Sequence, residues 1–213
     1  HGKEGMRALD LTLYLVLDPD LCDGADGMVE PPLAALHGGV TVVQLRAPNW
    51  KKRAIAECAR ELLRVMPASV PLIINAHADV ARAVGAAGVP LGQKDLSPED
   101  CRLIVGPDAF VGQSISNIDE LSSLSPAADH IGIGPVFPTG TKKDAAPVLG
   151  LDGLRSLLQH APAPAVAIGG IHEGNARSVY ETGVAGIAVV SAVCGQSAPE
   201  AAARTLLSRR PIF

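Results

Sequence analysis

The stretch AVAIGGIHEGNARSVYETGVAGIAVV, residues 165–190, decides the fold. It begins with a short apolar run at 165–168 and ends with a second one at 186–190, as buried strands do. Residues 173–182, which lie between the two runs, fit a helix. A strand, a helix and a strand in this order predict two parallel strands joined by a crossover helix.

The same unit recurs along the whole chain. Further apolar runs predict strands at 13–17, 41–45, 71–74, 88–91, 109–112 and 131–134. Helical patterns cover 28–36, 50–65, 78–84, 118–124, 151–158 and 199–207. One more helix is expected after Ser97, a typical capping residue, because Pro98 then occupies the first helical position. The chain therefore holds eight strand–helix units without a long linker.

Eight such units in 213 residues predict an α/β protein with a single (β/α)₈ barrel of the TIM type. The main rival is a flavodoxin-like open sheet, which normally stops at five strands. We expect the barrel domain to cover residues 10–213. Residues 1–9 are expected to be a tag remnant or flexible N-terminus, because their first five residues contain no hydrophobic segment of a secretory signal.

Composition excludes several classes of protein. The 18 basic and 22 acidic residues give a net charge of −4, which is not the basic footprint of a nucleic-acid-binding protein. No apolar run reaches the roughly 18 residues of a membrane span, so no membrane partner is expected. The cysteines Cys22, Cys58, Cys101 and Cys194 form no Cys-x-x-Cys pair. We therefore expect reduced thiols in a cytoplasmic protein.

Polar residues and glycines follow the predicted strands, where the active sites of such barrels lie. Taken alone, each fits a turn, a helix cap or a surface charge equally well, but the barrel would bring them all to one mouth. These residues are Gln44, Arg46, Asn75, Gln93, Asp95, Ser114, Thr139, Thr141, Lys142, Gly169, Gly170 and Ser191.

Two segments among them predict phosphate binding. The loop at 134–143 offers backbone N–H groups, the hydroxyls of Thr139 and Thr141, and the cation of Lys142, which together suit a pyrophosphate. Its alternative is a solvated surface loop. The loops after the last two strands, at Gly170 and Ser191, form the common phosphate site of this fold. Two phosphorylated ligands indicate a transferase rather than a hydrolase.

Asp95 is the carboxylate on the opposite side of the predicted mouth. Beside a pyrophosphate, a carboxylate makes sense chiefly as a Mg²⁺ ligand, since two anions would otherwise repel each other. The alternative is a structural role in capping the helix after Ser97.

Several motifs, taken together, resemble the thiamine-phosphate synthase (thiamine-phosphate pyrophosphorylase) family over about residues 12–207. The shared segments are VVQLR at 42–46, PLIIN at 71–75, LGQKDL at 91–96, the loop at 134–142, AIGGI at 167–171 and VVSA at 189–192. The resemblance implies that hydroxymethylpyrimidine pyrophosphate loses pyrophosphate and that a thiazole phosphate nitrogen attacks the carbocation-like methylene. It implies Mg²⁺ as cofactor and small phosphorylated molecules as partners, and it is compatible with a homodimer.

The resemblance also assigns roles to individual residues. Lys142, Ser114 and Arg46 are expected to be catalytic, and Asp95 to bind the metal. Substrate contacts are expected from Gln44, Arg46, Asn75, Ser114, Thr139, Thr141 and Lys142 on the pyrimidine pyrophosphate side, and from Gly170, Val190 and Ser191 on the thiazole phosphate side.

The chain departs from the family's pattern at four positions. Ala76 stands where the family has a second Mg²⁺-binding Asp, and Pro90 stands where it has His. Pro48 replaces a common Lys, and Ser116 replaces the His of a Ser-x-His motif. Losing one carboxylate should weaken the metal site. Two alternatives follow: a non-catalytic relative that binds thiazole or thiamine phosphate, and a tautomerase-like relative, which needs an acid–base residue where Ser116 lies.

Overall fold

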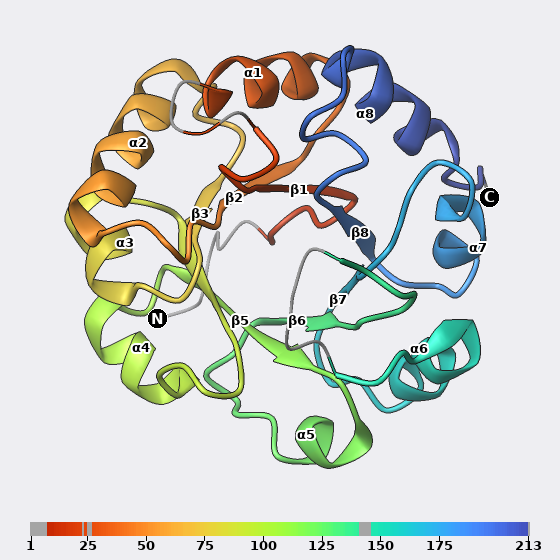
Figure 1. The fold of residues 1–213 in the computed structure, drawn as a ribbon. Helices are drawn as coiled ribbons and strands as arrows, with labels where there is room; N and C mark the ends of the chain where they lie inside the picture. Colours follow the sequence, from red (N-terminus) through yellow and green to blue (C-terminus); the bar gives the residue numbers. More distant parts are fainter. Residues whose placement is uncertain (1–7, 23, 25–26, 141–145, 213) are drawn as a thin grey trace.

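The computed structural model describes residues 8–22, 24, 27–140 and 146–212, and these form one closed eight-stranded barrel surrounded by eight helices (Figure 1). The strands are β1 (Leu13–Leu17), β2 (Val42–Leu45), β3 (Leu72–Ile74), β4 (Gly88–Leu91), β5 (Phe110–Ile115), β6 (His130–Ile133), β7 (Ala165–Ile168) and β8 (Gly186–Val189). The helices are α1 (Glu30–His37), α2 (Lys52–Val65), α3 (Ala78–Val84), α4 (Pro98–Val105), α5 (Ile118–Ser122), α6 (Gly150–Leu158), α7 (Ala176–Tyr180) and α8 (Pro199–Ser208). The predicted fold is confirmed.

Each strand pairs in parallel with the next one along the chain, and β8 closes the ring against β1. In this closing pair Leu13 lies opposite Ile187. Figure 1 views the barrel along its axis, with the strands at the centre and the helices around them. Closure leaves no free sheet edge, and it brings all the carboxyl ends of the strands to one mouth.

Alternation along the strands divides the apolar side chains into two cores. In β1, Leu13, Leu15 and Leu17 belong to the large cluster that includes buried residues of the helices, whereas Tyr14 and Val16 belong to a smaller cluster with residues of other strands. Successive side chains of a strand point to opposite faces. The smaller cluster therefore fills the barrel interior beneath the mouth.

Two helices, α4 and α2, illustrate the predicted capping and packing. In α4 the Ser97 Oγ accepts a hydrogen bond from the Asp100 N–H at 3.1 Å, and Pro98 is at the first helical position. In α2 the buried residues are Ile55, Ala59 and Leu62, whose spacing places them on one face. Within the described part of the chain, no helix has both the length and the apolar character to span a membrane.

Candidate active site at the barrel mouth

A cavity of about 800 Å³ opens at the carboxyl ends of the strands. Its lining includes polar or glycine residues from β2, β3, β5 and the loops after β6, β7 and β8. Eight of the predicted substrate-contacting residues line this cavity: Gln44, Arg46, Asn75, Ser114, Thr139, Gly170, Val190 and Ser191. Thr141 and Lys142 lie outside the described residues. The strand-end pattern thus converges on one cavity, as the barrel requires.

The Gln44 side chain is hydrogen-bonded to a tyrosine to which we assigned no role from the sequence. The Gln44 Nε2 donates a hydrogen bond to the hydroxyl of Tyr14, which lies on the neighbouring strand. Both side chains are buried, and burial raises the pKa of Tyr14 above its usual range. The tyrosine therefore stays neutral and fixes the orientation of the amide.

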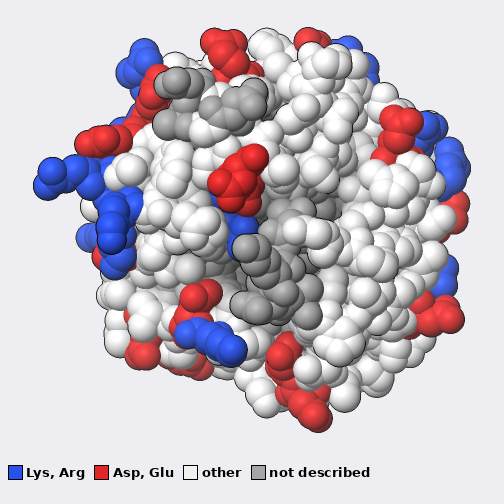
Figure 2. Space-filling view, in the orientation of Figure 1, with Lys and Arg blue, Asp and Glu red and all other residues white. Residues whose placement is uncertain are grey.

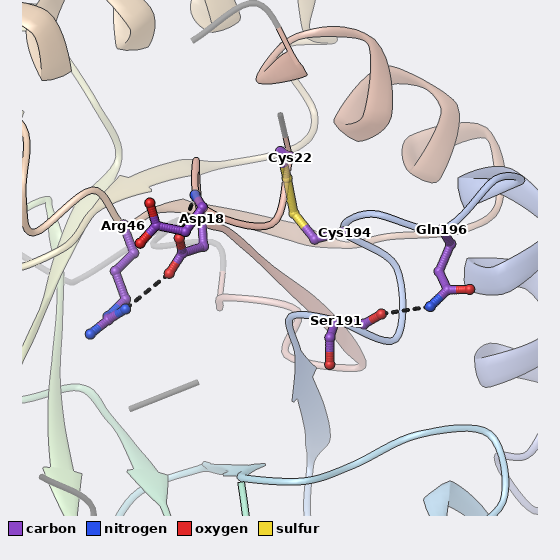
Figure 3. The surroundings of a disulfide bond; sticks show 7 residues. Asp18, Cys22, Arg46, Ser191, Cys194 and Gln196 are labelled. Carbon is purple, nitrogen blue, oxygen red and sulfur yellow. Dashed lines mark hydrogen bonds and ion pairs between the residues drawn. A yellow bond between two sulfur atoms is a disulfide. The ribbon is translucent and has the colours of Figure 1, made fainter. Parts of the chain in front are cut away.

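Arg46 supplies the cation of the cavity. It is the permanently charged residue among the described lining residues, and its Nη1 lies 3.1 Å from the Asp18 Oδ2 (Figure 3). Asp18 is 4% exposed, and its Oδ1 accepts the Asp20 N–H at 2.9 Å. Sequence reasoning gave Asp18 no role. The available signal was a carboxylate placed directly after a fully buried strand.

The described residues bring little other charge to the mouth. Figure 2 shows the charged side chains mostly around the rim of this face, with a small group near the centre. Of the described residues, an anionic ligand in the cavity would therefore depend on Arg46 and on neutral hydrogen-bond donors.

Asn75 and Ala76 follow β3, at the edge of the cavity. The Asn75 N–H donates to the Leu45 carbonyl at 3.0 Å, which extends the strand pairing by one residue. Ala76 then turns into the left-handed region, with φ of 62°, and its N–H donates to the Pro90 carbonyl at 3.0 Å. Position 76 therefore lies beside the end of β4, from which the Asp95 loop departs.

The Asp95 loop lies beside the main cavity. Asp95 is exposed, and its Oδ2 accepts the Gly92 N–H at 2.6 Å. It lines a smaller cavity of about 260 Å³ instead of the large one. Gln93 ties this loop to the large cavity, because its Nε2 donates to the carbonyl of Ser114 at 2.7 Å. Among the described residues, no group of three or more His, Cys, Asp or Glu side chains could hold a metal ion.

The glycines after β6 and β7 allow two loops to pack closely. A Cβ on Gly134 would lie 2.2 Å from the Ile168 carbonyl oxygen, and one on Gly170 would lie 2.6 Å from the Pro138 carbonyl oxygen. Gly170 also has a φ of 66°, which favours glycine. Both glycines also line the cavity, so each position combines close packing of the two loops with a place in the candidate site.

Residues after β7 and β8 build the predicted phosphate end. After β8, the N–H groups of Val193 and Cys194 both donate to the Val190 carbonyl, which forms a helical turn beginning at the cavity. After β7, the Asn175 Nδ2 donates to the Gly170 carbonyl at 3.0 Å. Asn175 also lines the cavity and was missed from the sequence, because it is separated from the strand end by a loop.

The expectation of reduced thiols is wrong for two of the cysteines. Cys22 and Cys194 form a disulfide, while Cys58 and Cys101 are free. The two bonded residues are 172 positions apart in sequence, and closure of β8 onto β1 brings their loops together (Figure 3). The bond joins the turn after Asp18 to the turn after Ser191, so it links two adjacent loops of the mouth.

Comparison with known proteins places the chain among relatives of one kind. The sequence profile described as thiamine monophosphate synthase matches residues 13–193. A thiamine-phosphate synthase from Laribacter hongkongensis is 47% identical over 94% of this chain and 95% of its own length. One from Azorhizobium caulinodans is 48% identical over 92% of this chain and 93% of its own. The solved structure of a thiamine phosphate pyrophosphorylase from Pyrococcus furiosus superposes with a TM-score of 0.83 at 37% identity, over 94% of this chain and 96% of that one.

Proposed function

This chain belongs to the thiamine monophosphate synthase family, and from that premise we propose how its own residues carry out the reaction. The activity is a transferase reaction that joins hydroxymethylpyrimidine pyrophosphate to thiazole phosphate. The bond between the methylene carbon and the pyrophosphate oxygen breaks, and its electron pair leaves with the pyrophosphate. The thiazole nitrogen then donates its lone pair to the methylene carbon and forms the new C–N bond.

The observation that carries this proposal is the arrangement of the cavity. Arg46 lies on one side, and the loops after β7 and β8 lie on another, so one cavity offers separate places for two phosphorylated ligands. The guanidinium and the Thr139 side are suited to the pyrophosphate, and Gly170 and Ser191 to the phosphate of the thiazole.

The protein's part in the chemistry is to stabilise charge and to orient the reactants. Negative charge grows on the leaving pyrophosphate, and Arg46, together with Thr139, Thr141 and Lys142 as the sequence predicts, would stabilise it in the transition state. The electron-rich aminopyrimidine stabilises the cation, so no protein nucleophile is needed. Gln44, Asn75 and Ser114 would position the ring, which lowers the entropic cost of reaching a reactive geometry.

The residues present fit a magnesium ion that is held partly by the protein and partly by the substrate. Mg²⁺ often binds through one or two carboxylates together with substrate phosphates and water. Asp95 offers an exposed carboxylate in a loop that Gln93 ties to the edge of the cavity, and Ala76 offers none. We propose that Asp95 holds the ion together with pyrophosphate oxygens, where it would neutralise charge on the leaving group.

A synthesis assay with both substrates tests the proposal. We expect thiamine phosphate and pyrophosphate to form in equal amounts, and Arg46→Ala to lower kcat/KM by roughly 100-fold, as loss of a charge-stabilising donor does. Arg53→Ala is the matched control, because Arg53 is an exposed cation on α2 that does not line the cavity. Tight binding of thiamine phosphate without turnover would instead support the non-catalytic alternative.

A further inference from the structure

We infer that Asp18 is a positioning residue that holds the Arg46 guanidinium toward the leaving pyrophosphate. The inference rests on the proposed function, because it requires Arg46 to act on that group. Asp18 does not line the cavity and so acts through Arg46.

The pairing of β1 with β2 brings the two residues together. Leu17 lies opposite Leu45, so Asp18 and Arg46 are each the first residue beyond paired strand ends. The Arg46 N–H donates to the Leu17 carbonyl at 2.9 Å, which fixes the backbone from which the arginine extends. The ion pair at 3.1 Å is therefore formed directly at the ends of two paired strands, next to the rigid wall of the barrel.

The carboxylate itself is held in place. One oxygen accepts the Asp20 N–H and the other accepts from Arg46. The Asp18 carbonyl accepts the N–H groups of Leu21 and Cys22 at 3.0 and 3.1 Å, which closes a turn directly above the strand. Cys22 is covalently joined to Cys194, so this turn is also anchored to the neighbouring loop after β8 (Figure 3).

The ion pair orients the flexible Arg46 side chain and occupies few of its hydrogen-bond donors. A guanidinium has five N–H donors, and the ion pair with Asp18 uses one of its nitrogens. With respect to the described residues, the remaining donors are available to an anion in the cavity. An arginine that is already ordered loses less side-chain entropy when the pyrophosphate binds. Orientation before binding is expected to favour the transition state.

A double-mutant cycle on the full-length protein tests the inference. We expect Asp18→Ala to lower kcat/KM by about 10-fold or more and Arg46→Ala by roughly 100-fold, whereas adding Asp18→Ala to Arg46→Ala should change the rate by less than about 2-fold. Asp18→Asn keeps an oxygen acceptor and should restore most of the activity. The KM for the pyrimidine pyrophosphate should rise in Asp18→Ala, and the KM for thiazole phosphate should stay unchanged.

The outcomes separate this inference from the function on which it rests. If Arg46→Ala leaves synthesis intact, the proposed role of Arg46 fails. If Arg46→Ala is impaired and Asp18→Ala reduces the rate by the same factor in both backgrounds, Asp18 does not act through Arg46 and the inference is overturned. A rise in both KM values would likewise overturn it, because a general disturbance of the mouth would affect both substrates. Should Asp18→Ala fail to fold, the same cycle with Asp18→Ser gives the coupling, because the serine hydroxyl can still accept the Asp20 N–H while the carboxylate is lost.

Discussion

Replacing Ala76 with Asp should improve both the stability of the fold and the binding of magnesium. Ala76 is a non-glycine residue at φ of 62°, a conformation that costs an ordinary L-residue roughly 1–2 kcal/mol. Asn and Asp are several-fold enriched in this region, which corresponds to about 1 kcal/mol. The Ala76→Asp and Ala76→Asn variants should therefore each raise the free energy of unfolding by up to about 1 kcal/mol, or a Tm by about 2–4 °C.

The two variants differ in charge, and that difference isolates the metal. Only Ala76→Asp adds a carboxylate beside the end of β4, where the N–H of residue 76 meets the Pro90 carbonyl. A second carboxylate should lower the Mg²⁺ concentration for half-maximal synthesis about 10-fold, which is roughly 1.4 kcal/mol. Urea unfolding measures the first effect and a magnesium titration of the synthesis rate the second. Equal magnesium dependence in Ala76→Asp and Ala76→Asn would refute the reasoning that places the metal between position 76 and Asp95.

Three further predictions concern the disulfide, a glycine and a thiol. Removing the disulfide with Cys22→Ser and Cys194→Ser should lower the free energy of unfolding by about 2–5 kcal/mol, because the bond joins residues 172 positions apart. Urea unfolding measures this change, and Cys58→Ser is the control. Gly170→Ala should destabilise by more than the roughly 1–2 kcal/mol of left-handed strain alone, because its Cβ would contact the Pro138 carbonyl, whereas Gly183→Ala meets no neighbour within 4 Å and should show the strain alone. Burial and the Glu61 carboxylate raise the pKa of Cys58 to about 11, so its alkylation should reach half its maximal rate near that pH; a midpoint near 9 would contradict this.

The fold could be predicted because its signal is local. Each strand is a short apolar run and each helix has its own period, so all sixteen elements were found from the residues within them. The errors lie where polar residues enter an element or where a loop competes with it. β5 extends to Ile115 through Gln113 and Ser114, which interrupt the apolar run. α7 begins only at Ala176, because the Asn175 Oδ1 accepts the His172 N–H and holds the preceding residues in a loop.

The candidate site could be predicted only where a residue lies at or close to the carboxyl end of a strand. Gln44 and Ser114 are the second-last residues of β2 and β5, Arg46 directly follows β2, and all three line the cavity. The residues that orient them lie elsewhere in the sequence. Asp18, for example, contacts Arg46 only because β1 pairs with β2. Cys22 and Cys194 come together only when the last strand meets the first. Such contacts depend on closure of the whole barrel, and neither residue spacing nor periodicity contains them.

The bond between Cys22 and Cys194 also determines how the molecule responds to mechanical force. A pull applied to the two termini is carried from Cys22 through the sulfur atoms to Cys194, so nearly all of the strands lie within a covalent loop that the force bypasses. Only β1 and the segments outside the bond can lengthen, while the seven strands from β2 to β8 stay inextensible until the bond is reduced. Reduction of the disulfide would therefore allow the whole chain, instead of only the segments outside the bond, to be extended by the force.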